Sequence, residues 1–304
     1  MTTAAEATRT ATRPVSRSVR FRRSPLGRFL VKVPFWLLIA AIFVYALFQF
    51  YWAVRSAFTP TVDLFNTPIS YWPSNPTLQN FKDVLSSSFF RTALLNSTIV
   101  AGSVTLLSLA VGSLAAYALG RFRFRGRSAV MYLMLSMTIF PQIAILGALY
   151  TAISRFHLYD TLGALIITYL IFTLPFTVWV LTSFMRQLPG DLEEAAYVDG
   201  ATPLQVFWKV LLPLIAPGLV TTGLLAFISA WNEYLYALSF IQSPGHYTVP
   251  LAITSFVSNT GSAFAVPWGQ IMAATVIVTL PLLLLVLILQ KRIIAGLTAG
   301  AVKG

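Results

Sequence analysis

Residues 186–213 read RQLPGDLEEAAYVDGATPLQVFWKVLLP, a long polar stretch of mixed charge between two strongly apolar segments. Pro189 and Gly190 end the apolar segment before it, and Leu212 and Pro213 lead into the segment after it. The flanking segments suit a lipid bilayer, whereas this stretch suits water. We therefore expect it to lie at a membrane surface and to contact a partner there.

The first half of this stretch predicts a short helix. Asp191 is expected to cap its N-terminus, and Glu193 and Glu194 place negative charge in its first turn, where the charge complements the helix dipole. The small side chains of Ala195 and Ala196 allow another backbone to approach closely.

The second half predicts a turn and another short helix. Asp199 and Gly200 form a turn signal. Apolar residues then follow at helical spacing and predict a single stripe: Leu204, Phe207, Trp208 and Leu211. Two interpretations fit this pattern, an amphipathic linker that rests on lipid headgroups and a surface that receives a partner.

The composition places the chain among membrane proteins. Of its 304 residues, 57% are hydrophobic and 10% are charged, whereas a soluble domain carries about 25% charged residues. The absence of cysteine excludes disulfides, thiolate metal sites and cysteine nucleophiles. The two histidines, His157 and His246, form no HExxH motif and receive no role, so we expect neither a metal site nor a catalytic site.

The apolar segments predict an all-α integral membrane protein. A helix needs about 20 apolar residues to cross about 30 Å of hydrocarbon. About six segments meet this requirement, at 33–54, 95–119, 129–150, 162–184, 214–238 and 269–289.

The positive charges predict the orientation of these spans. With both termini in the cytoplasm, the cytoplasmic segments are 1–32, 120–128, 185–213 and 290–304, and they hold 17 of the 21 lysines and arginines. This asymmetry is the positive-inside pattern. The net charge of +12 therefore reflects topology, and we expect no nucleic-acid partner.

Residues 1–32 form a basic leader, and residues 33–304 form the membrane domain. Residues 1–24 contain too few apolar groups to offset the entropy of ordering, which predicts disorder. A signal peptide and a transit peptide are the alternatives for this region. The apolar run at 33–54 is too long for a signal peptide and lacks an A-x-A-like exit, so we interpret it as a retained span.

The segments on the outer side differ in character. Residues 55–91 predict an irregular loop near the membrane interface with one short helix, and residues 239–268 are long enough to form a binding loop. Aromatic residues at the ends of the first span are expected to anchor it at the interfaces: Phe35, Trp36, Tyr51 and Trp52.

The stretch at 186–213 also resembles a known motif. Glu194-Ala195-Ala196, then Gly200, Val210 and Leu212-Pro213 resemble the EAA loop of bacterial ATP-binding-cassette (ABC) importer permeases. That loop has EAA, three residues, G, nine residues, I, one residue and LP. This chain departs from it at Val210, where valine replaces isoleucine.

Further motifs resemble the maltose-type (MalG-like) carbohydrate permeases among these binding-protein-dependent importers. They are Asn96-Ser97, Leu174-Pro175-Phe176, Pro217-Gly218, Trp231-Asn232-Glu233-Tyr234 and the tail from Gly296 to Gly304. The resemblance covers about residues 33–304 and implies the architecture of a type I ABC importer permease.

The resemblance implies an importer of several subunits in the bacterial cytoplasmic membrane. A second, homologous permease would complete the pathway, two ATPase subunits would use ATP and Mg²⁺, and an extracytoplasmic sugar-binding protein would deliver an oligosaccharide such as maltose, maltodextrin or trehalose. This chain has no G-x-x-x-x-G-K-[ST] phosphate loop and no cytoplasmic segment large enough for a nucleotide-binding domain, so we expect it to bind no cofactor itself.

The resemblance also implies roles for particular residues. The helix that docks into the ATPase would contain Glu194, Ala195, Ala196, Asp199 and Gly200. The tail that contacts both ATPases would contain Leu297, Thr298, Gly300 and Lys303. The outer loop that reaches the sugar-binding protein would contain Asn259, Thr260 and Gly261.

Three polar residues in or near the spans are candidates for the substrate pathway. Glu233 is the one acidic residue inside a predicted span, where a charge costs at least about 2.5–3.5 kcal/mol. With Asn232 beside it, Glu233 either contacts sugar or forms a structural hydrogen bond between spans. Asn96 has the same two interpretations.

Three other kinds of protein remain as alternatives. A permease for another small solute is the nearest. An ion-coupled secondary transporter would need its own binding constellation and usually internal repeats, and the sequence offers Glu233 and no clear repeat. A membrane-embedded enzyme would need a catalytic dyad or a metal set, for which we find no candidate residues.

Overall fold

A computed structural model describes residues 25–258 and 266–301 of the chain. Within these residues every regular element is helical, and the predicted all-α fold is confirmed. In the part of the chain that the structure describes, four helices are long and apolar enough to cross a membrane, or up to six if each of two bent helix pairs is one span. The predicted disorder of residues 1–24 and the candidates Asn259, Thr260, Gly261 and Lys303 lie outside the described residues.

The chain divides into two compact units, residues 1–51 and 52–304. The first unit contains most of α1 (Pro25–Ala57), which includes the predicted span 33–54. Apolar side chains all around this helix are exposed, among them Trp36 at 62% and Tyr45 at 72%. A helix with this surface suits contact with lipid or with another membrane helix.

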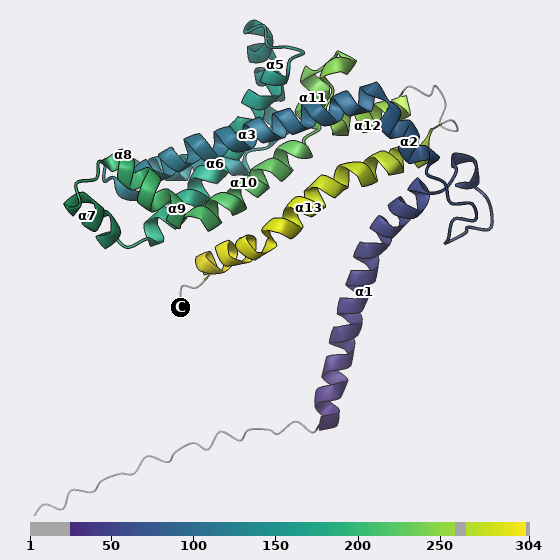
Figure 1. The fold of residues 1–304 in the computed structure, drawn as a ribbon, viewed down its shortest axis with the longest axis horizontal. Helices are drawn as coiled ribbons and strands as arrows, with labels where there is room; N and C mark the ends of the chain where they lie inside the picture. The colour runs from purple at the N-terminus through teal and green to yellow at the C-terminus, as the bar shows by residue number, and fades with distance from the viewer. Residues whose placement is uncertain (1–24, 259–265, 302–304) are drawn as a thin grey trace, which may run out of the picture. The chain divides into compact units, whose positions relative to one another are not determined.

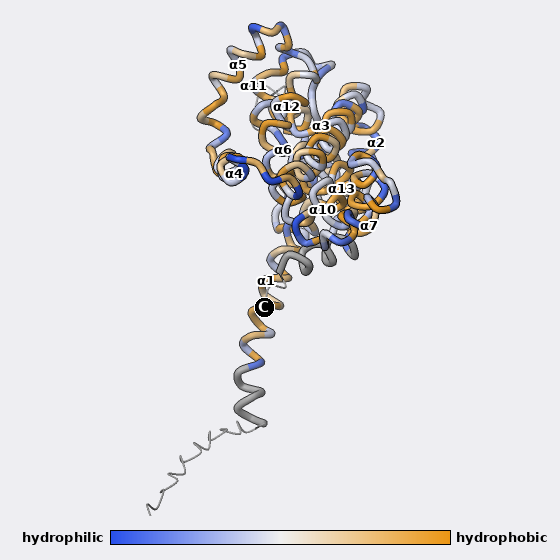
Figure 2. The backbone as a smooth tube through the Cα atoms, turned by 90° about the vertical axis from the view of Figure 1, so that its left-hand side faces the viewer, coloured by the Kyte–Doolittle hydropathy of each residue, from blue (hydrophilic) through white to orange (hydrophobic). Residues whose placement is uncertain are grey.

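The second unit is a bundle of helices, in which hydrophobic residues run along the long helices and hydrophilic residues gather at the bends and loops (Figure 2). Its longer helices are α3 (Ser88–Arg121), α4 (Arg127–Ile139), α6 (Leu162–Gln187), α10 (Ala216–Trp231) and α13 (Trp268–Ala301). Its shorter elements are η1 (Thr61–Asp63), α2 (Gln79–Ser86), η2 (Gln142–Ile145), α5 (Leu146–Arg155), α7 (Asp191–Val198), α8 (Pro203–Val206), η3 (Phe207–Leu211), α9 (Leu212–Leu214), α11 (Leu235–Phe240), η4 (Pro244–His246) and α12 (Val249–Ser258).

The core of the bundle forms where α3 packs against α6 and α10. Glycine allows a close approach of α3 to α6, because a Cβ added at Gly112 would lie 2.8 Å from Cγ2 of Thr177. Small residues at helix interfaces serve the same purpose in many membrane bundles.

Gly112→Ala is therefore expected to destabilise the bundle by about 1–3 kcal/mol, as overpacking of a filled core does. The matched control is Gly102→Ala in the same helix, where an added Cβ meets nothing within 4 Å. Alanine at this second position should stabilise the helix by about 0.5–1 kcal/mol. Thermal unfolding of the two variants in detergent measures the difference, and equal melting temperatures would contradict this account of the interface.

Two predicted spans are interrupted in the structure. The segment 129–150 is divided into α4 and the η2–α5 pair, which meet at 98°. The interruption falls at Pro141, which lacks an N–H and restricts the residue before it to extended backbone. The segment 214–238 is divided into α10 and α11, with a break between Trp231 and Leu235.

Two other helices are longer than predicted. Whereas the predicted span covers 95–119, α3 begins at Ser88, and the Ser87 hydroxyl accepts a hydrogen bond from the Phe90 N–H at 3.4 Å. The last helix continues past the predicted end at residue 289 to Ala301, so most of the predicted tail at 290–304 is helical.

Candidate functional site

The segment 186–213 lies at one end of the bundle (Figure 1). There α7 and α8 extend beyond the long helices, and α2 and α12 lie at the opposite end (Figure 1). Gly190 is the N-cap of α7, and no side chain caps this end. The expected cap by Asp191 is therefore wrong, because Asp191 is the first residue inside the helix, where its charge still complements the dipole.

An ion pair connects α7 to the end of α3. Arg121, the last residue of α3, contacts Glu193 in the first turn of α7, and both side chains are largely buried. The basic loop that begins at Arg121 thus lies at the same end of the bundle as the 186–213 segment. This is the placement that the charge distribution predicts for two cytoplasmic segments.

An apolar cluster holds the second short helix against the bundle. The Phe207 ring lies 5.2 Å from the Tyr117 ring of α3, and Leu211 is fully buried in the same cluster. The expected single stripe is wrong, because Leu204 and Trp208 are 62% and 55% exposed. Residues four apart share a helix face, so Phe207 and Leu211 form the buried face and Leu204 and Trp208 form the outer face.

The start of this second helix is also fixed locally. Thr202 accepts a hydrogen bond from the Gln205 N–H, and the Gln205 side chain accepts one from the Thr202 N–H. The sequence T-x-x-Q is the signal for this capping box. The capping box fixes where α8 begins, while the ion pair and the apolar cluster hold the short helices against the bundle.

The outer surface of α7 is exposed and mixed in chemistry. Glu194 and Ala195 are exposed there, while Ala196 is half-buried against the apolar cluster. Val198, near the end of the same helix, is 87% exposed. We refer to Glu194, Ala195 and Val198 as the α7 face.

The turn after α7 depends on glycine. Gly200 has φ +80°, and its N–H donates to the Tyr197 carbonyl at 3.0 Å. A residue with a side chain adopts this left-handed backbone at a cost of about 1–2 kcal/mol. Asp199 precedes it as the C-cap of α7 and is exposed.

At the opposite end of the bundle, Asn96 holds an outer loop. Its amide donates to the carbonyls of Gly245 and Tyr247 at 2.9 and 3.0 Å. The adjacent Ser97 hydroxyl accepts the Val249 N–H at 2.8 Å. These bonds support the structural interpretation of Asn96 over a place in the substrate pathway.

Asp160 holds the same outer loop from the other side. Its carboxylate accepts the N–H groups of Gln242 and Ser243, each at 2.9 Å, as well as the Ser243 hydroxyl. His246 lies 3.6 Å from it. Partial burial would raise the pKa of Asp160, but the hydrogen bonds from Ser243 and Gln242 and the charge of His246 outweigh it and lower the pKa from 3.8 to about 2.

These bonds are expected to persist at every physiological external pH. Because the folded pKa of Asp160 is depressed, its contribution to stability is complete above pH 3.8 and disappears as the pH falls toward about 2. Hydrogen exchange of the Gln242 and Ser243 amides, corrected for intrinsic rates, should show constant protection from pH 8 to pH 5 and loss only below about pH 4. In Asp160→Asn this acid transition should be absent. Loss of protection near pH 6 in the unmodified protein would contradict the assignment.

Glu233 lies in the break between α10 and α11, where it caps α11. One carboxylate oxygen accepts the Tyr236 N–H at 2.8 Å and the other accepts the Ala237 N–H at 3.2 Å. The neighbouring Asn232 is exposed, and its amide donates to the Ile228 carbonyl of its own helix. The three candidates Asn96, Asn232 and Glu233 therefore do not form one polar site in the structure.

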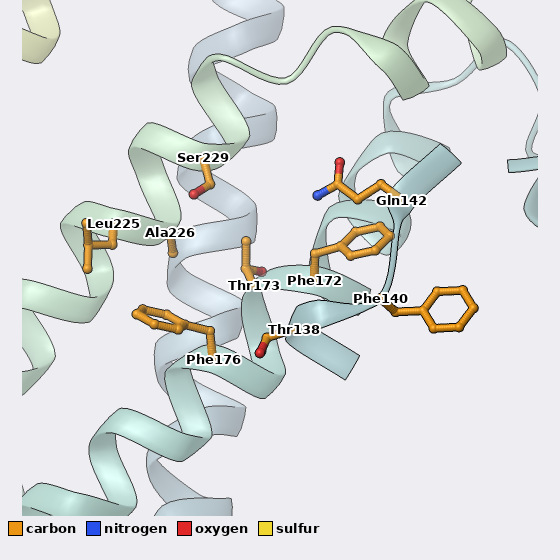
Figure 3. A pocket seen from close by; sticks show the side chains of 9 residues that line it. All are labelled: Thr138, Phe140, Gln142, Phe172, Thr173, Phe176, Leu225, Ala226 and Ser229. Carbon is orange, nitrogen blue, oxygen red and sulfur yellow. The ribbon is translucent and has the colours of Figure 1, made fainter. Parts of the chain in front are cut away.

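A cavity of about 310 Å³ lies between α4, α6 and α10 (Figure 3). It is lined by Thr138, Phe140, Gln142, Phe172, Thr173, Phe176, Leu225, Ala226 and Ser229. A smaller cavity of about 40 Å³ shares Gln142, Phe172, Thr173 and Ser229 with it and extends to Glu233. None of the residues around the larger cavity stands out as a candidate in the sequence, although Pro141 signals the break that places Gln142 there.

Among the described residues, no group of three or more His, Asp or Glu side chains could hold a metal ion. The candidates in and directly after α7 lie at one end of the bundle (Figure 1). Leu297, Thr298 and Gly300 lie in the C-terminal part of α13.

The helical bundle and its apolar surfaces define a multi-pass membrane protein. Residues 108–298 match the model of the family described as "binding-protein-dependent transport system inner membrane component". The chain belongs to this family.

Several relatives are similar over nearly their whole length. The trehalose/maltose transport system permease protein MalG of Thermococcus litoralis is 41% identical over 88% of this chain and 96% of its own. The trehalose transport system permease protein SugB of Mycobacterium tuberculosis is 38% identical over 90% and 98%. The diacetylchitobiose uptake system permease protein DasC of Streptomyces coelicolor is 35% identical over 93% and 100%.

A solved structure has the same fold. A chain of a bacterial ABC transporter involved in the import of the acidic polysaccharide alginate superposes with a TM-score of 0.79. The match covers 89% of this chain and 98% of that chain at 21% sequence identity.

Proposed function

We propose that this chain is a permease subunit of an ATP-driven importer that carries an oligosaccharide such as maltose, maltodextrin or trehalose across the bacterial cytoplasmic membrane. The sugar transport named for MalG, SugB and DasC supports the substrate class. The observation that carries the mechanism is the α7 face, which combines exposure with a rigid connection to the bundle.

Force would enter the permease through this rigid connection. An ATPase subunit that holds Glu194 and Ala195 moves α7 as its nucleotide sites close. The Arg121–Glu193 ion pair and the buried Phe207 transmit that movement to α3 and α6, because a packed core shifts as a unit rather than deforming continuously. The bundle then alternates between inward-facing and outward-facing states.

The partners follow from this mechanism. Two ATPase subunits supply ATP and Mg²⁺, and a second, homologous permease completes the pathway. An extracytoplasmic sugar-binding protein delivers the substrate to the outer end, where Asn96 and Asp160 hold the loop that leads to Asn259, Thr260 and Gly261. The C-terminal residues Leu297, Thr298, Gly300 and Lys303 would contact the ATPases as well.

Glu194→Lys tests this function most simply. Reversal of an exposed charge leaves folding within about 0.5 kcal/mol of the unmodified chain. At the interface, the mismatched charge should lower ATP-dependent sugar uptake by about tenfold or more, since like charges at a contact cost several kcal/mol. Uptake of radiolabelled maltose or trehalose into proteoliposomes that contain the whole transporter measures the effect.

Asp63→Lys is the control, because it makes the same charge reversal on a half-buried carboxylate of η1, outside the segment 186–213. Uptake should be largely retained in this variant. Unchanged uptake in Glu194→Lys would count against the coupling role. Ion-driven uptake by the purified chain without any partner would instead favour a secondary transporter.

A further inference from the structure

A break in each of two predicted spans borders the smaller cavity, which shares four lining residues with the larger one. One break, from Phe140 to Gln142, lies between α4 and η2, and the other lies between α10 and α11. The Tyr236 hydroxyl of α11 donates to the Gln142 carbonyl at 2.9 Å and joins them. Both breaks fall inside sequence-predicted spans, and broken backbone at membrane depth is tolerated where it is buried in protein or lines a water-filled cavity.

The cavity offers two polar groups that are not used elsewhere. Both Gln142 and Ser229 are exposed. Among the described residues, no hydrogen bond uses the side-chain amide of Gln142 or the hydroxyl of Ser229. In contrast, the hydroxyls of Thr138 and Thr173 donate to the carbonyls of Leu135 and Tyr169 in their own helices. A polar group that faces lipid without a partner is costly, so Gln142 and Ser229 indicate a water-filled surface.

Aromatic rings occupy the α6 wall of the same cavity. Figure 3 shows Phe172 on the side of Gln142 and Phe176 extending toward α10. The Phe172 ring is held in place because it stacks on the Tyr236 ring at 5.4 Å. A fixed apolar surface beside amide and hydroxyl groups is the combination that binds the faces and the hydroxyls of sugar rings.

The charge of the lining narrows the ligand class further. All nine residues around the larger cavity are uncharged. The nearest acidic residue, Glu233, lines only the smaller cavity, and both its oxygens accept backbone N–H groups of α11. This surface offers no charged group for an ionic ligand and suits a neutral one.

We propose that Gln142, Ser229, Phe172 and Phe176 form a contact surface for an uncharged sugar on its way through the membrane. The inference rests on the proposed function and deepens it, because it names the side chains of this permease that contact the sugar. Gln142 and Ser229 hydrogen-bond the sugar hydroxyls, and the two phenylalanines cover its apolar ring face. The cavity volume of about 310 Å³ suffices for a small ligand.

Thiol labelling tests this surface directly, since the chain contains no cysteine. Ser229→Cys and Gln142→Cys are placed separately in the complete transporter in proteoliposomes, and labelling of this chain by a charged methanethiosulfonate is followed by mass spectrometry. Leu106→Cys is the control, because Leu106 is 70% exposed on α3 and lines neither cavity. An apolar environment raises the pKa of a thiol by one unit or more. The thiol at position 106 should therefore react at most about one-tenth as fast as the thiols at positions 142 and 229.

Sugar should then protect both introduced thiols. The transporter is energised with ATP in the presence of the sugar-binding protein, either empty or loaded with maltose or trehalose, and the labelling rates are compared. The proposal predicts slower labelling at positions 142 and 229 with the sugar that is transported, and no change at position 106. Labelling as slow as the control, or fast labelling that the transported sugar does not alter, would overturn it.

Uptake by the unmodified transporter is measured in vesicles of the same composition. This measurement separates the claim of a sugar contact surface from the claim of an importer function. Uptake of either sugar with unprotected thiols refutes the contact surface and leaves the importer function intact. Absence of any uptake refutes the importer function, and the proposed sugar surface falls with it.

Discussion

Gly200→Pro is expected to abolish sugar uptake while the chain still inserts in the membrane. Gly200 has φ +80°, and proline is locked near −65°, so the turn between α7 and α8 cannot keep its shape. Proline also removes the N–H that donates to the Tyr197 carbonyl. Because the turn lies outside the predicted spans, the bundle should assemble normally. Uptake and ATPase activity of the reconstituted transporter measure the loss of coupling.

The chain provides a matched control at the other end of α7. Gly190 has φ −66°, which proline adopts without strain, and an added side chain meets nothing within 4 Å there. Gly190→Pro should therefore retain most of the uptake. Equal uptake in the two proline variants would show that the geometry of the Gly200 turn is irrelevant to transport.

Glu233→Ala is expected to destabilise the assembled protein strongly without changing its sugar selectivity. The carboxylate of Glu233 accepts two N–H groups at the start of α11. Without it, both donors remain unsatisfied at a cost of about 1–3 kcal/mol each. We expect a lower melting temperature and a several-fold lower yield of assembled transporter. Glu233→Gln keeps one side-chain carbonyl as an acceptor. Its melting temperature and yield should therefore lie between those of the unmodified chain and those of Glu233→Ala.

The neighbouring Asn232→Ala is the control for Glu233→Ala. Asn232 is exposed and bonds only the Ile228 carbonyl, which already accepts the Asn232 N–H. This substitution should change the melting temperature little. If Glu233→Gln assembled normally but lost sugar binding selectively, Glu233 would belong to the substrate pathway after all.

Local patterns in the sequence predicted much of the fold. Apolar length predicted where the long helices α3, α6 and α13 lie, and the clustered arginines predicted the end of the bundle at which α7 lies. The break at Pro141 was harder to predict, because a proline in a membrane helix can either kink it or end it. Its 98° bend depends on contacts such as that of Tyr236 with the Gln142 carbonyl, which come from distant parts of the sequence.

The candidate sites differ in the same way. The segment 186–213 could be singled out from the sequence, because its motif, turn and charges lie within one short stretch. The cavity could not, since packing of α4, α6 and α10 brings Gln142 to Ser229 and neither residue stands out in its own segment. Asn96 and Glu233 were noticed as polar residues in apolar spans, but only the structure shows the backbone groups that each one binds.

The proposed mechanism requires that α7 receives force from a nucleotide-hydrolysing partner. Replacement of Glu194 by a photoreactive amino acid, in membranes that contain the whole transporter, tests whether α7 touches such a partner. Illumination should produce an adduct between this chain and an ATPase subunit. An adduct with the extracytoplasmic sugar-binding protein instead, or with lipid alone, would contradict the account.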